Sequence, residues 1–322
     1  MKAAVLHTFG ETPKFEDFPD PPIGQGQLLV HVRAVALENI DKALANGSHF
    51  AAHQMLPQLP AIVGLDGIGM LEDGRLVGFG GLKSPYGALA ERTVIQEGYF
   101  VPIPEGVDAV TAAALPASAL TALFPLKWGA KLQPGETVLI NGATGVTGIL
   151  AIQIAKHLGA GRIVCTGRHT ETLQSLPQLG ADAILDLKLP DDQLARSLAE
   201  EAEKGFDVIL DCLWGHPTEM IIKSLVPHQL GFAKRRVRLI QIGEMAGSTI
   251  SLPADSLRTS GLEITGASAG LTPETIGEGT NMVWDWLRAG KLQLDIIRIP
   301  LSDIESAWQR TDLHGKRIVI VP

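Results

Sequence analysis

The chain has 322 residues, of which 45% are hydrophobic and 19% are charged, so it is long enough for two domains that each bury a core. Its formal net charge of −8 opposes sequence-independent binding to nucleic acid, which needs a surplus of Lys and Arg. No low-complexity tract interrupts the sequence, which excludes extensive disorder. We therefore expect a compact globular protein.

Up to about residue 110 the sequence consists of short apolar runs separated by Gly and Pro. Runs of this length between turn-forming residues are typical of strands in an antiparallel, partly barrel-like domain. They are KAAVLH, QLLVHVRAVAL, AIVGLDGIGML, LVGFGG, ALAERTVI and YFVPIP. The next segment, VDAVTAAALPASALTALFPLKWGA, has the pattern of a helix.

From GETVLING onward, apolar runs alternate with helical patterns, which indicates parallel βαβ units. We expect a doubly wound sheet of about six strands, formed by TVLIN, RIVCTG, AILDL, FDVILDC, RLIQIG and LEITGA. The C-terminal tail adds two helices and two strands that can return to the first domain. We therefore predict an α/β protein in which residues 1–118 and 259–322 form a discontinuous catalytic domain around an inserted domain, residues 119–258.

The segment LINGATGVTGILAIQIAKHLGA places a glycine-rich turn between a strand and a helix, which suits a dinucleotide. The helix N-terminus offers free N–H groups to a pyrophosphate, and glycine lets the backbone approach it. A plain connection between strand and helix is the alternative. The expected cofactor contacts in this turn are Gly142, Thr144, Gly145, Val146 and Gly148.

The end of the second strand indicates which dinucleotide is bound. NAD sites place an Asp or Glu about 20 residues after the glycines to hold the ribose 2′-hydroxyl, whereas a basic residue there accommodates a 2′-phosphate. Here the strand ends in Gly167, Arg168 and His169, with no acid before Glu171. We expect Arg168 to bind the 2′-phosphate of NADPH, and His169 either to assist or to lie on the surface.

The chain resembles the medium-chain dehydrogenase/reductase superfamily, and within it the zinc-independent quinone oxidoreductase branch. The resemblance runs from KAAVLH to GKRIVIVP through LPAIVGLDGIGML, YGALAERTVI, AAALPASALTAL, VLINGATGVTGILAIQIAKHLGA and FDVILDC. It implies a GroES-like catalytic domain, which is the discontinuous one, and a Rossmann domain. It also implies cofactor contacts at later strand ends, namely Leu213, Trp214, Gly243, Gly266 and Ala267.

Zinc-dependent relatives have metal ligands in the segments that match VALENID, GLDG and AAALPAS. Here VALENID contains no Cys, and Leu65 stands where GLDG would supply a His. A tetrahedral zinc site cannot be assembled from these positions, so we expect no metal. Without a Lewis acid, the acceptor must stabilise its own developing charge, as a quinone does by aromatisation and an α,β-unsaturated carbonyl does as an enolate. The alternative is an NADPH-binding sensor or crystallin-like protein with little turnover.

The resemblance points to ALENIDKALANG as part of the substrate site. The branch has Asn where this chain has Glu38, followed by an acid that matches Asp41. If Glu38 faces the cleft and burial keeps it neutral, it can donate a proton; an exposed or backbone-capping carboxylate is the alternative. Tyr86 lies in a turn that the resemblance places at the substrate mouth, where it either binds a carbonyl oxygen or packs. Phe50 either lines the entrance or belongs to a surface loop.

Partners other than the acceptor are predicted from the same resemblance and from charge. LRTSGLEITGASAG can supply an edge strand, so we expect a homodimer through the Rossmann domain. The basic cluster Lys234, Arg235, Arg236 and Arg238 is expected to be a solvated loop rather than a nucleic-acid patch. With no signal-peptide pattern and no uninterrupted apolar stretch of membrane-spanning length, we expect a cytoplasmic location and no membrane contact.

Overall fold

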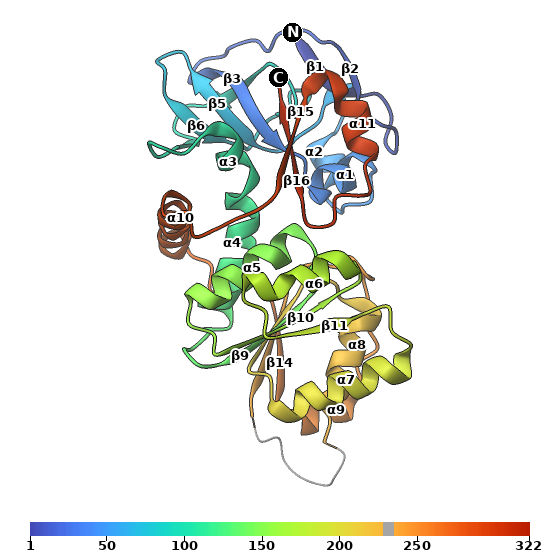
Figure 1. Cartoon of the computed structure of the whole chain (residues 1–322). Helices are drawn as coiled ribbons and strands as arrows, with labels where there is room; N and C mark the ends of the chain where they lie inside the picture. Colours follow the sequence, from blue (N-terminus) through green and yellow to red (C-terminus); the bar gives the residue numbers. More distant parts are fainter. Residues whose placement is uncertain (228–234) are drawn as a thin grey trace. The chain divides into compact units, whose positions relative to one another are not determined.

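The computed structural model describes residues 1–227 and 235–322, which divide into two compact units. Unit 1 comprises Met1–Pro116 and Asp295–Pro322, and unit 2 comprises Ala117–Leu294. Figure 1 follows the chain from the first unit into the second and back. The α/β class and the two predicted domain types are thus confirmed, including the discontinuity of the β-rich domain.

Unit 1 contains two sheets. The smaller has the order β2-β1-β4, with β1 Lys2–Leu6, β2 Lys14–Asp17 and β4 Ala61–Ile62. The larger has the order β15-β16-β3-β5-β6-β8, with β7 also paired to β3. Its strands are β3 Gln27–Ala36, β5 Gly67–Leu71, β6 Leu76–Phe79, β7 Arg92–Gln96, β8 Phe100–Pro102, β15 Ile296–Pro300 and β16 Arg317–Val321. The helices are α1 Asn39–Ala45, α2 Ala52–Met55, α3 Ala109–Ala114 and α11 Ile304–Gln309.

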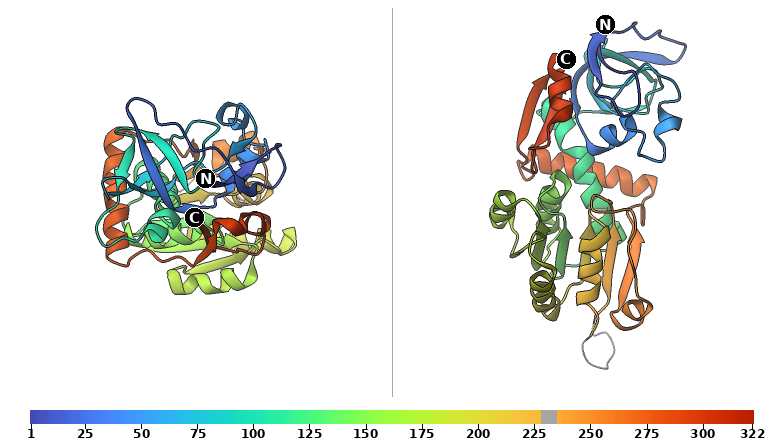
Figure 2. Two further views of the ribbon diagram at one scale, coloured as in Figure 1. Left: turned by 90° about the horizontal axis from the view of Figure 1, so that it is seen from above. Right: turned by 90° about the vertical axis from the view of Figure 1, so that its right-hand side faces the viewer.

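The returning tail completes the larger sheet of unit 1. β16 pairs antiparallel with β3, with Val319 opposite Ala36 and Ile320 opposite Val35, and β15 pairs parallel with β16. Both ends of the chain therefore lie close together in this unit (Figures 1 and 2). The pairing also fixes the end of β3, from which the chain enters α1.

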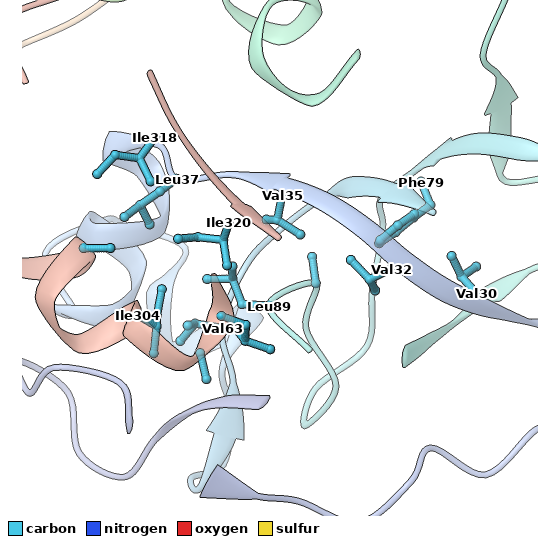
Figure 3. Close-up of a cluster of buried hydrophobic side chains, with 14 of the residues drawn as sticks. Val30, Val32, Val35, Leu37, Val63, Phe79, Leu89, Ile304, Ile318 and Ile320 are labelled. Atoms are coloured by element: carbon cyan, nitrogen blue, oxygen red, sulfur yellow. The ribbon is translucent and has the colours of Figure 1, made fainter. Parts of the chain in front are cut away.

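The core of unit 1 packs β3 against the returning tail (Figure 3). Val30 and Val32 are buried at alternate positions, as expected of a strand with one face inside. The pairing register of β3 with β5 shifts between Val32 and Ala34, and from Ala34 to the end of the strand every residue is buried. Ile318 and Ile320 of β16 and Ile304 of α11 bury their side chains in the same cluster.

Unit 2 is a parallel six-stranded sheet with the order β11-β10-β9-β12-β13-β14. Helices lie on both faces of the sheet (Figure 2). The strands are β9 Thr137–Asn141, β10 Arg162–Gly167, β11 Ala183–Asp186, β12 Val208–Asp211, β13 Val237–Gln241 and β14 Leu262–Gly266, and all six match the predicted runs. The helices are α4 Pro116–Phe124, α5 Val146–His157, α6 Thr170–Leu179, α7 Asp191–Lys204, α8 Gly215–Ser224, α9 Ala254–Thr259 and α10 Pro273–Arg288.

The second boundary between the units falls at Leu294–Asp295 rather than at the expected residue 258, whereas the first differs by two residues. β14 pairs with β13 and therefore belongs to the sheet of unit 2. α10 also packs there, because a Cβ built on Gly279 would lie 2.5 Å from the ring of Phe124. Gln153 of α5 exchanges hydrogen bonds with the backbone of Gln293, at 2.9 and 2.8 Å.

The predicted helix between the units is longer and more apolar than a typical surface helix. Ala109–Gly129 has the length and composition of a membrane span, which differs from our expectation that no stretch reaches that length. Of its most apolar window, 56% is buried within the protein, and the core helix of a soluble protein meets the same criteria. This helix is therefore weak evidence for a membrane span.

Candidate functional site

The turn between β9 and α5 requires glycine at two positions. Gly142 has a φ of +92°, a left-handed conformation that side chains disfavour. A Cβ on Gly148 would lie 2.5 Å from the Cα of Ala143 and 2.6 Å from the carbonyl oxygen of Gly142. The first turn of α5 thus packs directly against the end of β9.

The helix that follows begins without a side-chain cap. Its N-cap residue is Gly145, and no side chain accepts a hydrogen bond there. A Cβ on Gly145 would have only the carbonyl oxygen of Gly142 within 4 Å, at 3.7 Å, so space is open in front of the helix. The N–H groups of the first turn, from Val146 onward, are therefore available at the positive end of the helix dipole. This arrangement suits a phosphate group.

A buried polar network beneath the turn joins the carboxyl ends of three strands. The side-chain amide of Asn141 donates to Asp211 Oδ1 at 2.8 Å, and its oxygen accepts from the Thr166 hydroxyl at 2.6 Å. The same hydroxyl oxygen accepts the N–H of Gly142 at 3.1 Å, which anchors the glycine turn. Sequence reasoning missed Asn141 and Thr166. Polar residues at the ends of adjacent parallel strands are the pattern that could have found them.

Asp211 fixes the turn after β12. Its Oδ1 accepts the N–H groups of Leu213 and Trp214, at 3.0 and 3.1 Å, and its Oδ2 accepts the hydroxyl of Thr218 at 2.7 Å. Trp214 has a φ of 55°, which is rare for a bulky residue, and the hydrogen bond that its N–H donates to Asp211 helps to hold it there. Leu213 lies against the glycine turn, because a Cβ on Gly142 would meet its side chain at 2.9 Å.

Arg168 and His169, which directly follow β10, have different surroundings. Gly167 packs so closely on the turn that a Cβ there would lie 2.3 Å from Thr144 Cγ2. Arg168 is exposed directly after it, and its guanidinium makes no ion pair with another described residue. His169 is the N-cap of α6, and its Nδ1 lies 3.3 Å from the N–H of Thr172. His169 therefore has a structural role, whereas Arg168 is available to a ligand.

The remaining predicted cofactor contacts follow β13 and β14. Gly243 packs against the turn after β12, because a Cβ there would lie 2.8 Å from the carbonyl oxygen of Cys212. Gly266 ends β14 with nothing within 4 Å of its Cβ position, and Ala267 follows it. These residues lie at the carboxyl edge of the parallel sheet, the edge where ligands of such sheets bind.

In unit 1, Asp41 ties the start of α1 to the loop before β5. Its Oδ2 accepts the N–H of Glu38 at 2.9 Å, and its Oδ1 accepts the N–H of Leu65 at 3.2 Å. Asp41 is only 5% exposed. Burial raises the pKa of its carboxyl to about 7, with smaller contributions from the charges of Glu38 and Asp66, although the two backbone N–H groups lower it.

Glu38, the N-cap residue of α1, forms an ion pair. Its Oε1 lies 3.0 Å from a guanidinium nitrogen of Arg317, the first residue of β16, whose side chain is 8% exposed. Arg317 also donates to the carbonyl oxygen of Leu37 at 3.2 Å. A proton donor at Glu38 would have to give up this ion pair. The structure therefore points away from a neutral, proton-donating Glu38.

Unit 1 contains a cavity of about 210 Å³ with mainly apolar walls. Its polar side chains come from Asp41, Asp66, Ser84 and Tyr86. The hydroxyl of Tyr86 donates to the carbonyl oxygen of Asp20 at 3.3 Å, and its ring lies edge-on to Phe18, with centroids 5.9 Å apart. Tyr86 thus lines the cavity while its proton is already engaged, which favours the packing role.

Asp66 is a cavity residue that sequence reasoning did not single out. Asp66 is exposed to solvent, but it lines the cavity, and the neighbouring protein weakens the solvation of its carboxylate. This burial raises the pKa of its carboxyl to about 6; the charge of Glu38 adds to the rise and that of Arg317 opposes it. The acid next to Leu65 in GLDG was the available sequence signal.

The expected entrance residue Phe50 is 95% exposed and does not line the cavity. Its ring lies 4.4 Å from that of His49, while His53 packs edge-on against Phe9 at 4.7 Å. These contacts are those of a surface loop.

Comparisons with known proteins agree with this architecture. Residues 146–284 match the family described as zinc-binding dehydrogenase. A quinone oxidoreductase of Pseudomonas aeruginosa is 26% identical over 323 aligned positions, which cover 95% of this chain and 93% of that protein. The quinone oxidoreductase of Thermus thermophilus, solved alone and with NADPH, is 27% identical, with a TM-score of 0.78 and 100% of both chains covered. Over its whole length the chain is therefore similar to quinone oxidoreductases of the medium-chain dehydrogenase/reductase superfamily. These relatives place it in the quinone oxidoreductase branch.

A further similarity covers only part of the chain. A phenolphthiocerol synthesis polyketide synthase of Mycobacterium marinum is 32% identical over 221 residues, which cover 64% of this chain. The chain spans only 10% of that synthase, so the similarity concerns one part of a much longer protein.

The name of the matched family raises the question whether this chain binds zinc. The match lies entirely within unit 2, whereas the ligand positions in VALENID and GLDG lie in unit 1. Leu65 occupies one of those positions, and its side chain lines the cavity. Within residues 1–227 and 235–322, no three His, Cys, Asp or Glu side chains group as a metal site.

The three arginines of the basic cluster each lie near an acidic side chain. Lys234 lies outside the described residues. Arg235 is 3.8 Å from Asp207, Arg236 forms an ion pair with Glu263, and Arg238 lies 2.6 Å from Glu136. Since acids accompany these three arginines, they give little support to a nucleic-acid patch.

Proposed function

We propose that this protein is an NADPH-dependent oxidoreductase that transfers a hydride to a quinone or an α,β-unsaturated carbonyl without a metal. The observation that carries the proposal is the uncapped start of α5, with open space at Gly145, together with the exposed Arg168, which directly follows Gly167, a residue packed on the same turn. The Thermus thermophilus relative, which was solved with NADPH, supports the choice of cofactor.

The residues of unit 2 fit NADPH by their chemistry. The N–H groups at the start of α5 would bind the pyrophosphate, and Arg168 would bind the 2′-phosphate with two parallel hydrogen bonds. Leu213 and Trp214 belong to a turn that Asp211 fixes, so they would present a preformed surface to the cofactor. When bound, NADPH supplies the hydride, and the protein supplies orientation and a water-poor site.

The cavity of unit 1 is our candidate for the acceptor site. Its mainly apolar walls suit a planar, neutral molecule, and its acids disfavour one that carries a carboxylate. Since VALENID offers no Cys and Leu65 stands where GLDG would supply a His, we expect no zinc here, and the acceptor must stabilise its own charge. Quinones and α,β-unsaturated carbonyls both meet this requirement.

Fluorescence titration of the purified protein with NADPH and NADH, followed by turnover with a panel of quinones and enones, tests the proposal. We expect NADPH to bind at least tenfold more tightly, a difference of about 1.4 kcal/mol, and at least one acceptor to be reduced. Equal affinity for NADH would contradict the role of Arg168. The ion pair of Glu38, where the branch has Asn, favours the alternative of a sensor; NADPH binding with no turnover of any acceptor would support it.

A further inference from the structure

Two carboxyl groups line the cavity of unit 1, and they differ in what their oxygens do. Both oxygens of Asp41 accept backbone N–H groups, and the residue is 5% exposed. Asp66 is exposed at the cavity, and its carboxyl makes no hydrogen bond or ion pair with another residue in the described part of the chain. Asp41 is thus committed to the fold, while Asp66 can reach a bound molecule.

We propose that Asp66 donates the proton that the reduced acceptor takes up in this cavity. The inference rests on the proposed reductase function, and it assigns a catalytic residue in place of Glu38. Glu38 forms an ion pair with Arg317 at 3.0 Å, and the hydroxyl of Tyr86 already donates a hydrogen bond to the carbonyl oxygen of Asp20. Of the cavity acids, Asp66 is the one whose oxygens are open to a ligand.

The charges around Asp66 favour its protonated form near neutral pH. Glu38, the N-cap of α1, and Asp41, within α1, are negative when ionised, whereas Arg317 of β16 is positive and paired with Glu38. Burial and the charge of Glu38 raise the pKa of Asp66 to about 6. An acid with a pKa close to the working pH is well matched to general acid catalysis.

With an enone as the acceptor, the reaction adds one hydride and one proton. The β-carbon of the acceptor gains a hydrogen with its electron pair, and the π electrons of the C=C bond move toward the carbonyl oxygen to give an enolate. The O–H bond of Asp66 breaks, and its proton neutralises the enolate. The resulting carboxylate regains a proton from solvent, so one NADPH and one proton are consumed for each acceptor reduced.

Three variants test the role of Asp66 in turnover. Asp66→Asn keeps the size of the side chain but has no acidic proton, so we expect kcat to fall roughly 100-fold or more, with the Kd for NADPH within about twofold. Asp66→Glu restores an acid and should recover part of the rate. Asp17→Asn, an exposed acid of β2 outside the cavity, should leave kcat unchanged. Wild-type kcat should fall as pH rises through about 6, and that step should be absent in Asp66→Asn.

A second readout does not depend on turnover. In protein labelled with ¹³C at the Asp carboxyl carbons, we expect a resonance that titrates near pH 6 and is absent in Asp66→Asn. If Asp66 titrates near 4, or if Asp66→Asn turns over like the wild type, the proposal is overturned. If the wild type reduces no acceptor, the reductase function fails instead, and the NMR titration still decides whether Asp66 holds a proton near neutral pH.

Discussion

At the scale of single residues, Arg168 is the side chain on which the choice between the two dinucleotides depends. Arg168→Ala removes a charged partner of the 2′-phosphate, and a hydrogen bond to a charged group contributes about 1.5–3 kcal/mol. We therefore expect the Kd for NADPH to rise at least tenfold and the Kd for NADH to stay the same, as measured by fluorescence titration. Arg258→Ala, an exposed arginine of α9 in the same unit, is the matched control. Equal weakening of both cofactors would contradict the assignment.

Asp41 makes stability depend on pH. Its pKa is raised from 3.8 to about 7, so the folded protein binds more protons than the unfolded chain between these values. Since stability falls with pH wherever the native state holds the extra proton, we expect the free energy of unfolding to decrease as pH rises from about 4 to about 7. The change in pKa from 3.8 to about 7 corresponds to a decrease in the free energy of unfolding on the order of 4 kcal/mol.

Asp41→Asn isolates this contribution, because an amide does not titrate. Asn has only one side-chain oxygen for the two N–H groups, so at low pH we expect the variant to have a lower free energy of unfolding than the wild type, by a constant amount. Urea unfolding of both proteins between pH 4.5 and 8 should show that the wild type has the higher free energy of unfolding at low pH and that this difference shrinks as pH rises. A parallel pH dependence in the two proteins would show that Asp41 is not the titrating group.

At the scale of elements, the close contact between α5 and β9 predicts that adding one methyl group at Gly148 destabilises the protein. Gly148→Ala places a Cβ 2.5 Å from the Cα of Ala143, so the helix must move away from the turn. We expect a loss of roughly 1–3 kcal/mol in the free energy of unfolding, together with weaker NADPH binding. Gly277→Ala in α10 is the control, because nothing lies within 4 Å of its Cβ and alanine favours helix. Similar effects of both substitutions would refute the packing argument.

The edge strand β14 carries the proposal of a homodimer. β14 is the last strand of the sheet and pairs only with β13 among the described strands. A free edge exposes unpaired N–H and C=O groups to a second copy. We expect sedimentation to give twice the 34.3 kDa of one chain, and hydrogen exchange in β14 to slow as protein concentration rises. A monomer at micromolar concentration would contradict the proposal.

Strands and turns that depend only on residues close together in the sequence could be predicted from it. The six strands of unit 2 are apolar runs bounded by turn residues, and the glycine turn follows from the steric needs of Gly142 and Gly148. Partnerships across long stretches of sequence could not be predicted. Glu38 and Asp41 were singled out by their segment, but the pairing of Glu38 with Arg317 depends on β16 lying beside β3. The exposure of Asp66 at the cavity depends in the same way on folding.

At the scale of the whole molecule, the sequence predicts a discontinuous β-rich domain whose second segment begins at residue 259, whereas the second segment of unit 1 begins at Asp295. The sequence pattern of the tail does not show where it passes from one unit to the other. The structure divides it: α10 packs on α4 in unit 2, and only the chain after Leu294 joins unit 1. Hydrophobic periodicity identifies such helices, but it does not say which core receives them.

The late return of β16 to β3 also sets an order for biosynthesis. A ribosome makes β3, α1 and the cavity residues first, then all of unit 2, and only afterwards the strand that pairs with β3. Until Arg317 has been translated, Glu38 lacks its guanidinium and the valines of β3 lack Ile318 and Ile320. An interrupted translation product therefore exposes an unfinished sheet in unit 1 even if unit 2 has already folded. Such a product would be able to hold a nucleotide while its other half remained open to proteases.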